Sequence, residues 1–122
     1  MVVRVWHGWT TPTDADPYEA LLKEEIFVGI RDRRIPGFSS IQLLRRVSGS
    51  EVEFVTIMTF DALEAVRTFA GEDFEAAVVP EKARAVLAHF DTRSQHYELR
   101  AEVRGRKGGT GEAPSQGQSS DS

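Results

Sequence analysis

The chain has 122 residues, of which 40% are hydrophobic and 28% charged, with a formal net charge of −4. This composition predicts one ordinary globular domain. The acidic balance argues against a nucleic-acid partner, which needs a basic face, and the lack of cysteine excludes disulfides, thiolate metal sites and cysteine nucleophiles. Because there is no secretory leader and no run of ~20 apolar residues, we expect a cytoplasmic protein with no membrane partner.

The N-terminal third predicts a strand followed by a helix. Residues 2–10 are rich in valine and tryptophan, which is typical of a strand. After a polar turn, Asp16 as a cap and Pro17 at the first helical position predict a helix to about Arg33. Pro36-Gly37 then turns the chain. The helix has one apolar stripe, formed by Tyr18, Leu21, Leu22, Ile26 and Ile30.

The middle of the chain predicts a hairpin and a short helix. Residues 38–47 and 51–60 are strand-like, and Ser48-Gly49-Ser50 between them forms the turn. Asp61 and Glu64 have the spacing of a helix cap, and Gly71 ends the helix that follows.

The C-terminal part predicts a second helix and a last strand. Residues 74–79 are ambiguous, with a further helical turn as one option. Pro80 opens a helix through Phe90, and residues 92–102 form the last strand. The order β-α-β-β-α-β predicts an α+β, ferredoxin-like split βαβ fold with a four-stranded antiparallel sheet. We expect this domain to cover residues 1–102, and the Gly- and Ser-rich residues 103–122 to form a disordered tail.

Both faces of the predicted sheet carry large apolar side chains. On the first strand Val3, Val5 and Trp9 share one face, while Val2 and Trp6 share the other. In a chain this short the helices cover one face only, and an open apolar face usually marks an interface. The tail lacks the apolar residues needed to cover the second face. We therefore expect a homodimer whose two sheets pack together.

Several segments resemble the antibiotic biosynthesis monooxygenase superfamily, the dimeric α+β barrels, over roughly residues 2–101. They are Trp6-His7-Gly8-Trp9-Thr10, Ile35-Pro36-Gly37-Phe38, Leu43-Leu44-Arg45-Arg46, Glu53-Phe54, Phe60-Asp61 and Glu64-Ala65-Val66. The resemblance implies that two sheets pack into a barrel with the helices outside, and that each subunit has a pocket between sheet and helices. It also implies either a cofactor-free oxygenase for polycyclic aromatic substrates, a haem-degrading oxygenase, or a member without settled activity.

The haem-degrading branch is marked by an Asn on the first strand, a Trp at the end of the third and a His on the following helix. Here His7 and Gly8 lie in the first region, Phe60 ends the third strand, and residues 61–88 contain no histidine. The sequence thus departs from the haem-degrading pattern. We expect no metal and no cofactor.

His7 is the first candidate for a catalytic base. Histidine is the usual acceptor where a phenol or enol must ionise, and His7 shares its face with Val3, Val5 and Trp9. A neutral imidazole beside an indole suits a planar aromatic substrate, with Trp9 as the stacking wall. The alternative is that His7 is a hydrogen-bonded core residue and Trp9 simply packs.

His96 is the second candidate, because the first and last strands are neighbours in this topology and His96 could approach His7. Tyr97 beside it could donate a hydrogen bond to an oxyanion, and Tyr18 on the first helix could line the same pocket. The alternative for His96 is an exposed polar edge. His89 is most simply a helix-end residue. The three histidines do not have metal-ligand spacing.

Two functions remain from the sequence. The first is a cofactor-independent monooxygenase that acts on an aromatic or enolisable small molecule, with histidine as base. The second is a non-catalytic small-molecule-binding or stress-response dimer of the same fold. An isomerase or lyase that uses the same base is a weaker third possibility, because enolisation is a shared first step.

Overall fold

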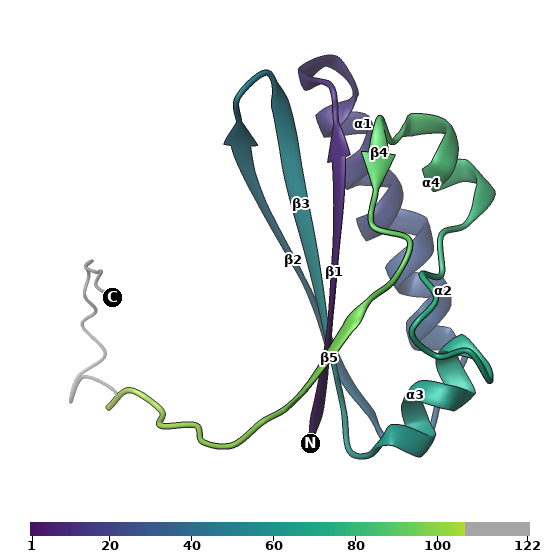
Figure 1. The fold of residues 1–122 in the computed structure, drawn as a ribbon, viewed down its shortest axis with the longest axis vertical. Helices are drawn as coiled ribbons and strands as arrows, with labels where there is room; N and C mark the ends of the chain where they lie inside the picture. The colour runs from purple at the N-terminus through teal and green to yellow at the C-terminus, as the bar shows by residue number, and fades with distance from the viewer. Residues whose placement is uncertain (107–122) are drawn as a thin grey trace.

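The structure is a computed structural model that describes residues 1–106. Its elements in chain order are β1 (Val2–Thr10), α1 (Pro12–Leu21), the π-helical segment η1 (Leu22–Ile26), α2 (Phe27–Asp32), β2 (Phe38–Ser48), β3 (Glu51–Phe60), α3 (Leu63–Ala70), α4 (Glu81–Val86), β4 (His89–Phe90) and β5 (Gln95–Glu98). The helices lie together on one side of a twisted sheet (Figure 1).

The sheet is antiparallel, with the strand order β2-β3-β1-β4, and β5 also pairs with β1. β4 and β5 follow the same edge of β1, so two short pieces take the place of a fourth strand. The predicted α+β fold of ferredoxin-like type is confirmed.

The first helix begins earlier than Asp16 and Pro17 predict. Thr11 is its N-cap and accepts a hydrogen bond from the Asp14 N–H at 3.3 Å, while Pro17 lies inside the helix. Thr11 followed by Pro12 offers the same cap signature one turn and a half earlier. The early start also buries Tyr18, which is 1% exposed, against the sheet.

This helix continues through η1 into α2 without a break in direction (Figure 1). At the junction the Phe27 N–H donates to the Leu22 carbonyl, five residues back. One extra residue per turn shifts the side chains that follow it around the axis, and such segments often occur at functional sites. Leu22 and Ile26 both face the cavity described below.

The C-terminal half differs most from expectation. The helix predicted to reach Phe90 ends at Val86, and residues 74–79 are not helical. The predicted strand 92–102 is reduced to β5, and β4 falls where helix was expected. The reason is the free edge of β1: the Ala88 N–H donates to the Trp9 carbonyl at 2.8 Å, and the Asp91 N–H to the His7 carbonyl at 3.0 Å. These bonds draw the chain into extended form.

The start of α3 also differs slightly, because its N-cap is Ala62 rather than Asp61; its end at Gly71 is as predicted.

Two apolar clusters fill the space between sheet and helices. The first joins α1 and α4 to β3, and consists of Ala15, Tyr18, Leu22, Val52, Phe54 and Ala83. The second joins α3 to the other end of β3, and consists of Ile35, Met58, Phe60, Ala65, Val66 and Phe69. Residues from both clusters line one cavity, so the cavity lies at their junction.

The other face of the sheet has no helix over it in the described part of the chain (Figure 1). By the register it carries Val3 and Val5 of β1, Val55 and Ile57 of β3, and Leu44 of β2, which is 51% exposed. The predicted tail 103–122 falls mostly outside the described residues, and its boundary at 102 stays a prediction. None of the described helices is long and apolar enough to cross a membrane.

Candidate functional site

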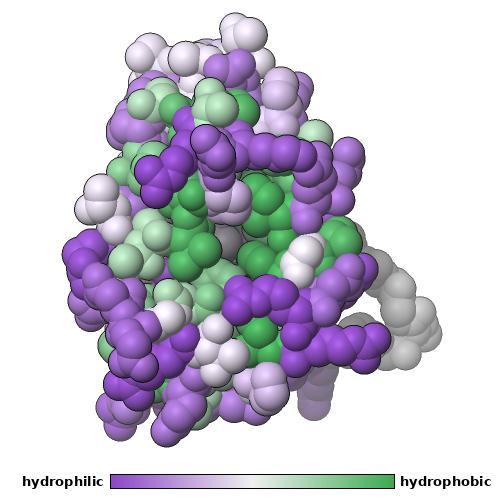
Figure 2. Space-filling view, turned by 90° about the vertical axis from the view of Figure 1, so that its right-hand side faces the viewer, coloured by the Kyte–Doolittle hydropathy of each residue, from purple (hydrophilic) through white to green (hydrophobic). Residues whose placement is uncertain are grey.

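The candidate site is a cavity of about 60 Å³ between the sheet and the helices. Viewed from the helix side, hydrophobic side chains gather around a central hollow and hydrophilic ones surround them (Figure 2). The polar and aromatic side chains of its lining include Arg4, Trp6, Tyr18, Thr56, Phe69 and Ser94. The wall is therefore apolar and aromatic with a few polar groups, as in most small-molecule sites.

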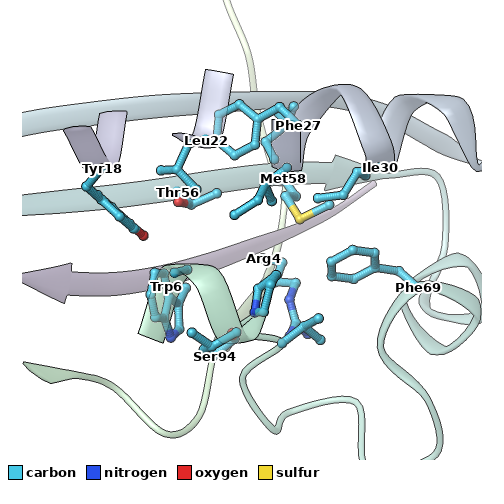
Figure 3. A pocket seen from close by; sticks show the side chains of 16 residues that line it. Arg4, Trp6, Tyr18, Leu22, Phe27, Ile30, Thr56, Met58, Phe69 and Ser94 are labelled. Atoms are coloured by element: carbon cyan, nitrogen blue, oxygen red, sulfur yellow. The ribbon is translucent and has the colours of Figure 1, made fainter. Parts of the chain in front are cut away.

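Arg4 is the charged group of this cavity, and only 3% of it is exposed. Its guanidinium donates to the carbonyls of Phe74 and Ala76, the latter at 3.0 Å, and lies 5.4 Å from the centre of the Phe69 ring. Figure 3 shows it on the sheet side of the cavity, between Trp6 and Phe69. Burial lowers the pKa of Arg4 to about 10, so the group keeps its charge at neutral pH.

His96 lies directly opposite Arg4 in the β1–β5 pair, and its Nε2 is 3.0 Å from the Arg4 Nη1. A guanidinium has no acceptor, so Nε2 must accept and the proton of His96 must be on Nδ1. Burial first, and the Arg4 charge second, lower the pKa of His96. Nδ1 is buried and has no hydrogen-bond partner among the described residues.

Two aromatic side chains with polar tips complete the site. The Tyr18 hydroxyl points from α1 towards Trp6 (Figure 3), and burial raises the pKa of this phenol well above its usual range, so it stays a donor. The Trp6 indole N–H donates to the Asp91 carbonyl at 2.7 Å, which fixes the ring. Its edge lies where a Cβ on Gly8 would be, 2.8 Å away, so the glycine makes room for the indole.

The open face of the sheet carries a separate aromatic stack. Trp9 is stacked on His89 at 4.5 Å between ring centres and on His7 at 6.1 Å. His7 Nδ1 lies 3.3 Å from an Asp91 carboxylate oxygen, and His89 Nε2 lies 2.9 Å from a Glu51 oxygen. These side chains are on the face away from the helices.

The predicted site residues therefore fall in two places. Tyr18 lines the cavity. His96 does not line it but contacts Arg4, which does. His7 and Trp9 lie on the open face, and so does Tyr97, which is opposite Val3 and 57% exposed. The structure does not bring His7 and His96 together, because even- and odd-numbered residues of β1 point to opposite faces.

The sequence analysis missed Arg4 and Trp6 as cavity residues. A signal was present in the alternation of the first strand. One face carries Val2, Arg4, Trp6, Gly8 and Thr10, and Arg4 is the charged residue on this otherwise uncharged face. An ionisable residue at an inward strand position is rarely buried without a reason. What the sequence lacked was an indication of which face the helices cover.

The comparisons with known proteins point to one fold. Neither a family profile nor a curated protein matched the sequence. Among solved structures, the haem degrader MhuD of Mycobacterium tuberculosis, with two haems in its active site, is 26% identical; the match covers 85% of this chain and 100% of MhuD, with a TM-score of 0.54.

Two further structures share the fold at lower identity. A monooxygenase of Streptomyces coelicolor, ActVA-Orf6, solved with nanaomycin D, is 16% identical over 86% of this chain and 92% of its own, with a TM-score of 0.55. A putative antibiotic biosynthesis monooxygenase of Bacillus cereus is 13% identical over 87% and 97%, with a TM-score of 0.57. These likenesses confirm the predicted resemblance: the chain has the fold of the antibiotic biosynthesis monooxygenase-like proteins.

Proposed function

We propose that this protein is a cofactor-independent monooxygenase that oxidises an aromatic or enolisable small molecule in the helix-side cavity. The observation that carries the proposal is the cavity itself, an aromatic wall with a buried cation and a phenol donor. Proteins of the same fold include a monooxygenase solved in complex with nanaomycin D.

The chemistry needs little from the protein beyond binding and charge stabilisation. The substrate loses a proton, and its electron-rich carbanion gives electrons to oxygen. A CH₂ group becomes a carbonyl, one oxygen atom enters the substrate, and the other leaves as water, so that the substrate supplies all four electrons. Trp6 and Phe69 would hold the ring, Arg4 would hold an anionic group of the substrate, and the Tyr18 hydroxyl would stabilise the developing oxyanion.

The ionised form of the bound enol or phenol is favoured, in this proposal, by a hydrogen bond from the Tyr18 hydroxyl, and the proton leaves to solvent water. His96 already accepts a hydrogen bond from Arg4, and His7 lies on the opposite face. The catalytic roles predicted for these two histidines stay predictions, and a His7→Ala variant tests the first of them.

The likeness to MhuD raises haem as a ligand, and the cavity does not fit it. No imidazole is among its lining side chains, and the sequence has no cysteine. Tyr18 and Met58 are the lining side chains that could ligate iron. The raised pKa of Tyr18 disfavours the phenolate, and methionine serves as a haem ligand together with a histidine, which the lining lacks. We derive no step through haem.

A homodimer is part of the proposal. The open face carries Val3, Val5, Val55 and Ile57, of which Val5 and Ile57 pair across β1 and β3, while Val3 lies opposite Thr59 and Val55 opposite His7. Packing against a second copy would remove this area from water, at ~25 cal/mol per Å² of apolar surface.

The alternative is a non-catalytic binding protein of the same fold, and the small cavity volume favours it. It predicts that ligands bind and that oxygen is not consumed.

Oxygen uptake with anthrone and with 1,4-dihydroxynaphthalene tests the proposal. We expect uptake above the rate of autoxidation, and a decrease of about 10²-fold in kcat for Tyr18→Phe, which removes one oxyanion donor and little volume. The matched control is Tyr97→Phe on the open face, with unchanged kcat. No uptake above autoxidation with either compound would overturn the oxygenase.

A further inference from the structure

We infer that the ligand of this cavity is a planar aromatic acid whose carboxylate pairs with Arg4. This inference names a substrate class for the same site and so rests on the proposed function, but its test is separate.

The first observation is that the buried arginine has no acidic partner. Among the described residues no carboxylate oxygen lies within 4.0 Å of the Arg4 guanidinium, whereas exposed arginines do form such pairs. Arg45 pairs with Glu19 at 2.7 Å, and Arg46 with Glu53 at 2.8 Å. Exposed arginines are thus paired although water already screens their charge. The buried Arg4 has no carboxylate partner among the described residues, although burial of an unpaired charge is energetically unfavourable.

The second observation is that the guanidinium is oriented but not neutralised. Its three partners are the carbonyls of Phe74 and Ala76 and the ring of His96, all of which are neutral. These account for three of its five N–H donors. Two donors remain, the number that a carboxylate accepts in a bidentate pair.

The third observation is the role of His96. Because its Nε2 accepts from Arg4, the ring is held neutral and does not supply a second positive charge or an anion. His96 is therefore a positioning residue, which directs the guanidinium without cancelling its charge.

The fourth observation is the shape of the surroundings. Trp6 and Phe69 lie on either side of Arg4, and Ser94 is a further polar residue of the lining (Figure 3). The hollow opens at the helix surface (Figure 2), so the ring of a ligand larger than the closed cavity can lie in the opening. Apolar walls with one cation at the base suit an aromatic body with one anionic end.

A purely structural role for Arg4 makes a different prediction. Its bonds to the Phe74 and Ala76 carbonyls fasten residues 71–80 to the sheet, and a neutral donor could do the same. If that were its whole role, the cavity would not distinguish an acid from an amide of the same shape.

The experiment compares 2-naphthoate with 2-naphthamide by isothermal titration calorimetry on the full chain. We expect the acid to bind at least about tenfold more tightly, because a hydrogen bond between charged groups changes the dissociation constant by about tenfold or more. Arg4→Gln should remove this preference, and Arg4→Lys should keep part of it. Arg46→Gln is the control and should keep the full preference.

Each outcome decides the inference. Equal affinities of the wild-type protein for acid and amide, or binding of neither, would overturn it, and this comparison needs no variant to fold. A preference for the acid that survives Arg4→Gln in a folded variant would also overturn it. Acid binding without oxygen uptake would overturn the oxygenase only, whereas uptake without acid preference would overturn the carboxylate only.

Discussion

Arg4 and His96 show how one pair of neighbouring strand positions sets the chemistry of the site. They face each other across β1 and β5, on the helix side of the sheet. Because the arginine can only donate, the histidine has one possible tautomer when the pair forms. Protonation of His96 would place two cations 3.0 Å apart in a buried setting.

The pair therefore predicts a loss of stability in acid. The pKa of His96 is lowered in the folded state, so between its unfolded value near 6.5 and its folded value the unfolded chain binds more protons. The free energy of unfolding should fall as the pH falls from 7 through this window. His96→Gln keeps an acceptor for Arg4 and removes the titration. Urea unfolding at pH 7 and pH 5 should show a smaller loss in this variant, and an equal loss would contradict the expectation.

At the scale of single residues, the sequence predicts which residues of a strand share a face, but it does not predict which of the two faces packs against the helices. The period of two correctly places His7, Trp9, Val3 and Val5 on one face of β1. Sequence alone does not say which face the helices cover. The sequence pattern therefore indicated His7 and Trp9 as site residues and did not indicate Arg4.

Among the elements, β1 has the largest influence on the C-terminal half. Gly8 makes room for neighbouring side chains, and the free edge of the strand pairs with residues that follow α4. Gly8 leaves the space into which the Trp6 ring and Leu87 pack. The edge of β1 takes the backbone donors of Ala88 and Asp91, which ends α4 early.

Two glycines give a matched prediction. Gly8→Ala places a Cβ 2.8 Å from the Trp6 ring and should lower the free energy of unfolding by ~1–3 kcal/mol through overpacking. Gly29→Ala, in α2 with nothing within 4 Å, should raise it by ~0.5–1 kcal/mol, because alanine favours the helix. Thermal and urea unfolding measure both. A neutral Gly8→Ala would mean that the Trp6 ring moves freely.

The element order and the strands of the N-terminal half could be predicted, and the C-terminal half could not. β1 and β3 match their predicted ranges because their patterns are long and their ends are marked by turn residues. Residues 74–98 contain alanine, valine and histidine without a clear period. Their structure depends on hydrogen bonds to β1, which are distant in sequence.

For the whole molecule, the two faces of the sheet differ. The described helices cover one face, and a second copy is proposed to cover the other. Ile57 pairs with Val5 near the middle of the open face.

Sedimentation velocity at micromolar concentration should show a dimer. Ile57→Lys places a charge in the proposed interface and should give a folded monomer, because an unpaired buried charge opposes association. Val103→Lys is the control: Val103 is 94% exposed and lies outside every described element. A wild-type protein that sediments as a stable monomer would exclude the dimer and weaken the barrel arrangement.

The cavity at the junction of the two apolar clusters has a consequence for how such a protein can change its substrate. Each cluster packs mainly on its own helices, so side chains at the boundary between them can be exchanged without emptying either centre. Trimming or enlarging such boundary residues would reshape the chamber at modest cost to folding. Partly buried lining residues such as Ile26, Ile30 and Val79 are therefore the positions at which the chamber can be reshaped with less loss of stability than at its fully buried members.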